Sequence, residues 1–284
     1  MIRSSKLKLF LRLTGLLILA SIVVYAYARE IEPVLLTVKY ENIYSNYIND
    51  KNDDIKIIQF SDAHISEFFD VKNLKKAVDR INSQNPHIVV FTGDLIDKYN
   101  EYNDKDNLNK IWEVLKEINA PLGKYAVYGN HDYGGGAERA YKQIMEKSGF
   151  KVLLNKNEKL EEYNINIIGM DDSIFGTLDK EAIVSSLDED YFNIILSHEP
   201  DVAEYFLEYD ADLFLTGHSH GGQINLPLIN YTPPLAQKYV RGMYEVHNYR
   251  QTKIYVNVGL GTSQIPMRFM ATPELTVITL KDAK

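Results

Sequence analysis

The chain has 284 residues, of which 45% are hydrophobic and 25% are charged, a composition typical of a globular protein with one large domain or two small ones. It contains no cysteine, which excludes disulfides, thiolate metal ligands and cysteine nucleophiles. The net charge is −8, and all 39 acidic residues follow residue 28. Such an acidic body disfavours a nucleic-acid-binding surface, so we expect no nucleic acid partner.

The N-terminal region has the pattern of a signal anchor. A short basic segment, residues 1–12, precedes an apolar stretch without charges, residues 13–28. This stretch is slightly shorter than the ~20 residues of a spanning helix. The positive-inside rule then predicts a single-pass protein of the cell membrane, with residues 1–12 in the cytoplasm and the body outside. Secretion after cleavage near Ala28 and burial as a core helix remain as alternatives.

The rest of the chain predicts an α/β fold. A polar connector, residues 29–54, leads into a domain spanning residues 55–284, in which apolar runs alternate with helical patterns. We expect strands at 55–60, 87–91, 124–128, 165–170, 192–196 and 212–215, and helices at 74–81, 108–118 and 137–147. Three strand-like segments then follow without a helix between them, and we expect them to form or extend a second sheet: 239–245, 253–257 and 275–280.

Side chains that bind metals follow the predicted strands. Five of the seven histidines fall in five short segments, each placed after an apolar strand. In open α/β sheets ligands bind at the carboxyl ends of the strands, so these segments are expected to meet at one edge. Together they predict a metal site, whereas any one alone is weak evidence. The segments are Asp62-Ala63-His64, Gly93 to Asp97, Gly129 to Asp132, Ser197-His198-Glu199 and Gly217 to His220.

The order of these segments resembles the calcineurin-like metallophosphoesterases, whose signature runs D-x-H, G-D-x-x-D, G-N-H-[DE], H and G-H-x-H. The resemblance covers roughly residues 55–280. It implies a layered β-sandwich flanked by helices, here preceded by an N-terminal transmembrane helix. The segments 217–223 (GHSHGGQ) and 259–268 (GLGTSQIPMR) are similar to a membrane-associated bacterial branch that includes phosphodiesterases and UDP-2,3-diacylglucosamine hydrolases.

The resemblance implies two divalent metal ions and assigns their ligands. Imidazole and carboxylate ligands suit Mn, Fe, Zn or Co. A hydroxide formed from a water between the two metals would attack the phosphorus. The first metal would be held by Asp62, His64 and His220, and the second by Asn130, His198 and His218, with Asp94 between them.

The same resemblance gives roles to residues outside the ligand set. His131 would protonate the leaving oxygen, with Asp97 fixing its orientation, although Asp97 is also a candidate cap. Asp132 would support the metal ligands. Three polar residues are candidates for substrate binding, against the alternative that they are ordinary core or surface residues: Gln223, Arg241 and Arg268.

The substrate is expected to be a phosphodiester or pyrophosphate on a lipid or an envelope precursor, because the anchor holds the site near lipid head groups. Lys98 stands where protein phosphatases have an arginine, which disfavours that class. The alternatives are a phosphatase acting on soluble nucleotides and an inactive metal-binding surface module. We expect a monomer.

A serine hydrolase is a further alternative, because residues 217–221 (GHSHG) fit the nucleophile-elbow pattern G-x-S-x-G. That fold requires a helix after the serine, followed by an acid and a histidine. Pro227 disfavours the helix, and only Glu245 and His247 follow as an acid with a later histidine. The sequence therefore disfavours this alternative.

Overall fold

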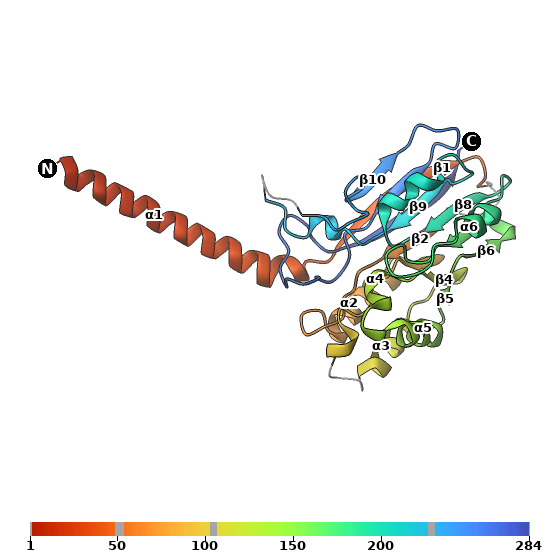
Figure 1. The fold of residues 1–284 in the computed structure, drawn as a ribbon, viewed down its shortest axis with the longest axis horizontal. Coiled ribbons are helices and arrows are strands. Elements are labelled where there is room, and N and C mark those ends of the chain that lie inside the picture. Colours follow the sequence, from red (N-terminus) through yellow and green to blue (C-terminus); the bar gives the residue numbers. More distant parts are fainter. Residues whose placement is uncertain (1, 49–53, 103–106, 227–230, 284) are drawn as a thin grey trace.

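The computed structural model describes residues 2–48, 54–102, 107–226 and 231–283. Its body consists of two six-stranded sheets packed face to face, with helices on the outer faces (Figure 1). The predicted α/β sandwich is therefore confirmed. Buried apolar residues fill three layers: one between the sheets and one under the helices on each outer face.

The first sheet carries the predicted N-terminal strands. Its strand order is β1-β12-β2-β3-β4-β5, with β2 to β5 parallel and β12 antiparallel to β2. Strands β2 and β3 are buried on both faces, which explains their nearly continuous apolar sequences. The bounds are β1 Thr37–Ser45, β2 Ile55–Phe60, β3 Ile88–Phe91, β4 Gly123–Ala126, β5 Lys151–Val152 and β12 Glu274–Asp282.

The second sheet has the order β10-β11-β9-β8-β7-β6. Strands β7, β8, β9 and β11 are parallel, and the two edge strands β6 and β10 are antiparallel to their neighbours. The bounds are β6 Lys156–Leu160, β7 Ile165–Gly169, β8 Phe192–Leu196, β9 Leu213–Thr216, β10 Gly242–Glu245 and β11 Lys253–Val256.

Helices cover both outer faces of the sandwich. Helices α2 (Val71–Asn82), α3 (Asn107–Lys116) and α5 (Glu138–Lys147) lie against the first sheet, where their apolar residues join one core cluster. Helix α6 (Lys180–Ser186) and the 3₁₀ turn η6 (Pro200–Phe206) lie against the second. The short helix α4 (Asn130–Tyr133) directly follows the end of the β4 segment.

Two parts of the predicted organisation are wrong. Strand β12 does not join the second sheet; it lies between β1 and β2 in the first sheet. Residues 37–45 are not a connector, because they form β1 and pair in parallel with β12 along nine residues. Both errors have one cause: β1 pairs with the C-terminal strand, a contact that local sequence does not reveal. Residues 49–53 of the predicted connector lie outside the described residues.

The N-terminal helix α1 (Ile2–Ala26) projects from the body (Figure 1). Within the described chain it is the one helix that is long and apolar enough to cross a membrane. It continues into a π-helical turn, η1 (Tyr27–Ile31), and a 3₁₀ turn, η2 (Glu32–Val34). We call residues 27–34 the elbow. Unlike α1, the elbow buries two residues, Ala28 and Glu32, against the body.

Candidate metal centre

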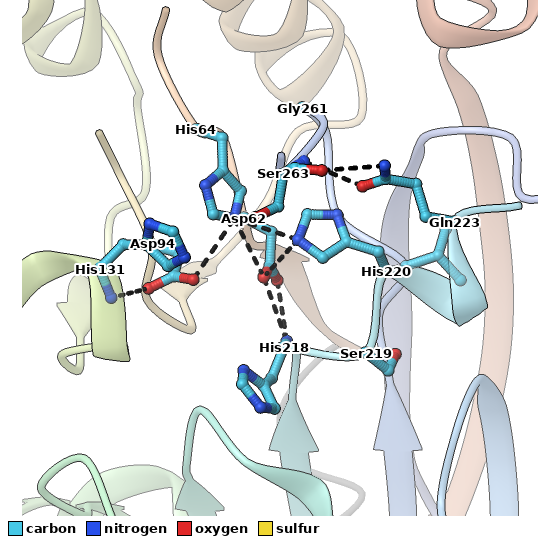
Figure 2. A network of polar contacts seen from close by, with 12 residues as sticks. Asp62, His64, Asp94, His131, His218, Ser219, His220, Gln223, Gly261 and Ser263 are labelled. Atoms are coloured by element: carbon cyan, nitrogen blue, oxygen red, sulfur yellow. Dashed lines mark hydrogen bonds and ion pairs between the residues drawn. The ribbon is translucent and has the colours of Figure 1, made fainter. Parts of the chain in front are cut away.

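All five predicted segments meet at the carboxyl ends of the parallel strands. Asp62 and His64 follow β2, Asp94 follows β3, and His198 follows β8. Asn130 begins α4 after β4, while His218 and His220 follow β9. Because the two sheets face each other, loops from both contribute to one cluster (Figure 2).

The backbone of these loops is held in an uncommon conformation. Five of the predicted ligands have positive φ angles, in the left-handed region that residues other than glycine rarely adopt. Such conformations persist where the surrounding structure demands them, and they concentrate at functional sites. The five are Asp62 (φ 49°), His64 (φ 42°), Asp94 (φ 62°), His218 (φ 66°) and His220 (φ 49°).

Gly129 permits the close approach of two of these loops. A Cβ atom at Gly129 would lie 2.3 Å from Oδ1 of Asp94 and 2.8 Å from Cε1 of His198. Any side chain at this position would therefore push the carboxylate and the imidazole apart. The neighbouring loop also requires glycine at position 93, because few other residues tolerate the φ of 96° that Gly93 has.

The predicted ligands form two adjacent groups. In the first, ligand atoms of Asp62, His64 and His220 all lie within 4.8 Å of one another. The second group has the same compactness and consists of Asp94, His198 and His218. Asp94 of the second group also reaches the first, because its Oδ2 lies 3.3 Å from Nε2 of His64 and 3.2 Å from Nε2 of His198.

Three of the imidazoles are oriented by oxygen atoms outside the cluster. Nδ1 of His198 lies 2.7 Å from the Thr92 carbonyl oxygen, and Nδ1 of His64 lies 3.1 Å from Oδ1 of Asp97. Nε2 of His218 lies 2.9 Å from the Pro234 carbonyl oxygen. Each outer nitrogen must donate its proton to these acceptors, which leaves the inner nitrogen with a free lone pair.

The inner nitrogens face each other in pairs. Nε2 of His64 lies 3.0 Å from Nε2 of His220, and Nδ1 of His218 lies 3.2 Å from Nε2 of His198. Two lone pairs at this distance repel unless a proton or a cation lies between or beside them. Oδ1 of Asn130 is also buried without a hydrogen-bond partner in the described part of the chain. The donor set therefore fits cations bound to nitrogen and oxygen.

The pKa values point to the same demand for positive charge. Burial alone would raise the pKa of Asp94, but the charges of His198 and His131 hold it well below its ordinary value. Burial would lower the pKa of His64 and His198, yet the neighbouring carboxylates raise both well above the ordinary value. Burial lowers the pKa of His218 to about 4 and that of His220 well below its ordinary value.

Comparison with known proteins identifies this arrangement. Residues 55–222 match the family model of the calcineurin-like phosphoesterases, and these residues contain every loop of the cluster. The chain is also 42% identical over 262 residues to the uncharacterized metallophosphoesterase YkuE of Bacillus subtilis, covering 90% of each chain. The chain belongs to the calcineurin-like phosphoesterase family. It is an enzyme of the metallophosphoesterase type.

Two more distant relatives carry names that refer to lipids or membranes. The UDP-2,3-diacylglucosamine pyrophosphatase LpxG of Chlamydia muridarum is 26% identical, with 79% of this chain and 83% of that protein covered. The transmembrane protein with metallophosphoesterase domain of Danio rerio is 29% identical, with 81% of this chain and 54% of that protein covered. These names describe the two relatives; in this chain, helix α1 is long and apolar enough to cross a membrane.

Asp132 holds two of the loops that form the centre of the metallophosphoesterase. It is buried, and its carboxylate accepts hydrogen bonds from the backbone N–H groups of Asp94, Leu95 and Gly129. These bonds fix the loop that carries Asp94. The sequence predicted this supporting role, but it did not reveal the two carbonyl groups that orient histidines, those of Thr92 and Pro234.

Asp97 and His131 are arranged differently from the prediction. Nδ1 of His131 lies 2.6 Å from the backbone carbonyl oxygen of Asp97, whereas the Asp97 carboxylate lies closer to Nδ1 of His64, at 3.1 Å, than to that of His131, at 3.6 Å. His131 is also held by its backbone N–H, which donates to Oδ1 of Asp94 at 2.8 Å (Figure 2). The orientation of the His131 ring thus depends on the backbone carbonyl of Asp97, while the carboxylate of Asp97 accepts a hydrogen bond from His64.

The three predicted substrate-binding residues lie in different surroundings. The side chain of Gln223 bonds to the backbone of Ser263 and Ile265 (Figure 2). Arg241 is exposed and donates to the Met270 carbonyl oxygen at 3.0 Å. Arg268 is fully buried, at 0% exposure, and donates to backbone carbonyls. The burial of Arg268 and its backbone partners favour the alternative of a core residue, while its role in substrate binding stays a prediction.

Ser219, the serine of the G-x-S-x-G pattern at residues 217–221, is not placed as a nucleophile. It is buried, and its hydroxyl donates to the Val240 carbonyl oxygen at 2.6 Å while accepting from the Gly221 N–H. The three residues that follow it form a 3₁₀ turn, His220–Gly222, and not the helix that a serine hydrolase requires.

The depressed pKa of His218 predicts a specific loss of stability in acid. The ordinary pKa of 6.5 applies to the unfolded chain, whereas burial and the charge of His198 lower it to about 4 in the folded chain. The stability linked to the neutral imidazole is therefore present above pH 6.5 and is lost as the pH falls to about 4. Over this window, chelator-treated protein is expected to lose about 3 kcal/mol more than the variant His218→Asn, which has no imidazole to titrate.

Denaturant unfolding of the full chain in detergent at a series of pH values measures this difference. The exposed His247 offers a matched control, because His247→Asn should keep the pH dependence of the wild type. Identical pH dependence in the wild type and His218→Asn would contradict the prediction.

Proposed function

We propose that this metallophosphoesterase hydrolyses a phosphodiester or pyrophosphate bond with two divalent cations held by Asp62, His64, Asp94, Asn130, His198, His218 and His220. The observation that carries the proposal is the pair of facing imidazole contacts, at 3.0 and 3.2 Å, next to the unpaired oxygen of Asn130. When bound, two such cations supply Lewis acidity, a nucleophilic water and neutralisation of the charge that develops on phosphoryl oxygens.

His131 is proposed as the general acid. Its side chain is 25% exposed, whereas the six imidazole and carboxylate residues of the two groups are buried, so it faces the side from which a substrate arrives. Nδ1 donates its proton to the Asp97 carbonyl oxygen, so Nε2 of the imidazolium form carries the second proton, which it would donate to the leaving oxygen and so become neutral. The backbone bond to Asp94 fixes this ring relative to the cluster.

Asp97 is proposed as a positioning residue for His64. Its carboxylate accepts from Nδ1 of His64, which fixes the tautomer and raises the basicity of Nε2. We expect Asp97→Ala to weaken metal binding about 10–100-fold, the usual effect of losing such a partner. His131 should stay in place, because its own partner is the backbone carbonyl.

Calorimetric titration of the chelator-treated chain with Mn²⁺ tests this role. The variant Asp97→Asn retains an acceptor oxygen and should recover most of the affinity. Unchanged Mn²⁺ affinity in Asp97→Ala, together with lower activity, would instead place the carboxylate in the proton transfer of His131.

The proposed reaction itself is tested with bis-p-nitrophenyl phosphate and added Mn²⁺. We expect turnover that chelation abolishes and that Mn²⁺ restores. Asp94→Asn should lower kcat at least about 10²–10³-fold, because Asp94 contacts both groups and its charge is lost. The exposed Asp190 provides the matched control, and Asp190→Asn should behave as the wild type. A protein that binds two metals without turnover would favour the inactive binding module.

The proposed substrate is lipid-linked, and the protein is proposed to span the cell membrane once, with its N-terminus inside and the body outside. Helix α1 supports this, since its large apolar side chains are exposed. Exposed apolar residues continue beyond α1, on the elbow at Val34 (59% exposed) and on neighbouring loops at Phe68 (47%) and Ile265 (51%). The name of the LpxG relative, a UDP-2,3-diacylglucosamine pyrophosphatase, is consistent with such a substrate.

Two cavities support a route between this apolar surface and the metal centre. A cavity of about 770 Å³ is lined by Asp97, next to His64, and extends to Phe68 and Pro266. A second cavity of about 230 Å³ is also lined by Phe68 and Pro266, and it reaches Arg29 and Val34 of the elbow. We propose that a substrate anchored in a bilayer at the end of α1 occupies these cavities and approaches the centre on the side of Asp97.

Competition between lipid and soluble substrates tests this proposal. We expect the full chain in vesicles to hydrolyse a lipid-linked pyrophosphate with a lower KM than a soluble nucleotide diphosphate. Phe68→Ala, which removes an exposed apolar contact, should raise KM for the lipid about 10-fold, as loss of a partly buried aromatic contact of ~1.5 kcal/mol would, and leave the KM for bis-p-nitrophenyl phosphate unchanged. Turnover of soluble nucleotides alone would support the soluble phosphatase.

A further inference from the structure

The elbow is bound to one loop of the body, residues 258–273. The Ala28 carbonyl oxygen accepts from the Arg268 N–H at 2.8 Å, and Oε1 of Glu32 accepts from the Ala271 N–H at 2.6 Å. Directly after the elbow, the Pro273 carbonyl oxygen accepts from the N–H of Thr37 at 2.9 Å. Glu32 is buried at 1% exposure, although it lies only a few residues beyond an exposed helix. A buried carboxylate at this position is costly unless it is bonded, so its contact with the loop is a specific one.

Arg268 holds the 258–273 loop together from inside. Its guanidinium donates to the carbonyl oxygens of Val258 (2.9 Å), Gly261 (3.0 Å, from Nε) and Ala271 (2.7 Å). The same group reaches the metal centre, with Nη2 3.4 Å from Nδ1 of His220. The carboxylates of Asp62, Glu274 and Glu32 offset the burial of this cation.

The opposite side of the loop is pressed against the Asp62–His64 segment. The Gly261 N–H donates to the Asp62 carbonyl oxygen at 2.8 Å, and the Leu260 N–H donates to that of Ser61 at 3.0 Å. A Cβ atom at Gly261 would lie 2.1 Å from the Ala63 carbonyl oxygen. The loop therefore backs the strained residues Asp62 and His64, which cannot keep their left-handed φ angles without support.

We propose that the elbow is a positioning element of the metal centre: Glu32 and Ala28 hold the 258–273 loop, and through Arg268 and Gly261 this loop positions the group formed by Asp62, His64 and His220. The elbow is then more than a tether to the membrane anchor. It couples the seating of α1 most directly to one of the two metal groups. The Asp94, His198 and His218 group is reached only through the first one, since the His218 N–H donates to the Asp62 carboxylate and Asp94 lies 3.3 Å from His64. This inference rests on the proposed two-metal function.

The test uses the full chain in detergent and calorimetric titration with Mn²⁺ after chelation. The variant Glu32→Ala removes the acceptor for Ala271, and we expect one of the two binding steps to weaken about 10-fold or more while the other weakens much less. Glu32→Gln retains an acceptor oxygen and should restore most of the affinity. Glu30→Ala is the matched control, because Glu30 lies in the same turn with its side chain 73% exposed.

Kinetics provides a second measurement, which distinguishes weaker metal binding from a general loss of folded protein. In Glu32→Ala the Mn²⁺ concentration for half-maximal activity should rise about 10-fold, while kcat at saturating Mn²⁺ stays within about 2-fold of the wild type. If Glu32→Ala does not fold, Arg268→Lys is measured in the same way, since lysine keeps the charge but cannot reach three carbonyl groups.

Two outcomes would overturn the inference: wild-type binding in both steps, or equal weakening of both. A wild-type chain that binds no Mn²⁺ would instead refute the proposed function. The two failures are therefore distinguishable.

Discussion

The structure depends on one electrostatic constraint: buried imidazole and carboxylate groups converge on a space that requires positive charge. Nε2 of His64 and Nε2 of His220 lie 3.0 Å apart, and Asp94 touches both groups of ligands. Acceptors outside the cluster fix the proton on the outer nitrogen of three rings. The inner nitrogen of each ring therefore directs its lone pair into the cluster. Three features keep these groups together: the loops with left-handed residues, the close approach that Gly129 permits, and the hydrogen bonds that the buried Asp132 accepts.

The two sheets meet this constraint from opposite sides. Loops after β2, β3 and β4 belong to the first sheet, and loops after β8 and β9 belong to the second. Neither sheet alone supplies a complete group, because Asp62 and His64 require His220, and Asp94 requires His198 and His218. The packing between the sheets, which buries residues such as Ile57, Ile194 and Leu215, therefore also sets the geometry of the centre.

The N-terminal region is part of the same construction. Strand β1 pairs with β12, and the elbow before it binds the loop that carries Arg268. The elbow lines one cavity, which shares Phe68 and Pro266 with the cavity lined by Asp97.

The sequence by itself determined the α/β class, the apolar N-terminal segment and the five segments that meet at the site. These features are local: apolar runs report buried strands, and the residues after them report the strand ends. Only the tertiary structure decided that β12 joins the first sheet, that residues 37–45 form a strand, and that Arg268 is buried. It also decided that the backbone of Asp97, not its carboxylate, holds His131. The physical reason is that backbone groups and strand pairings between distant segments leave no trace in the local sequence.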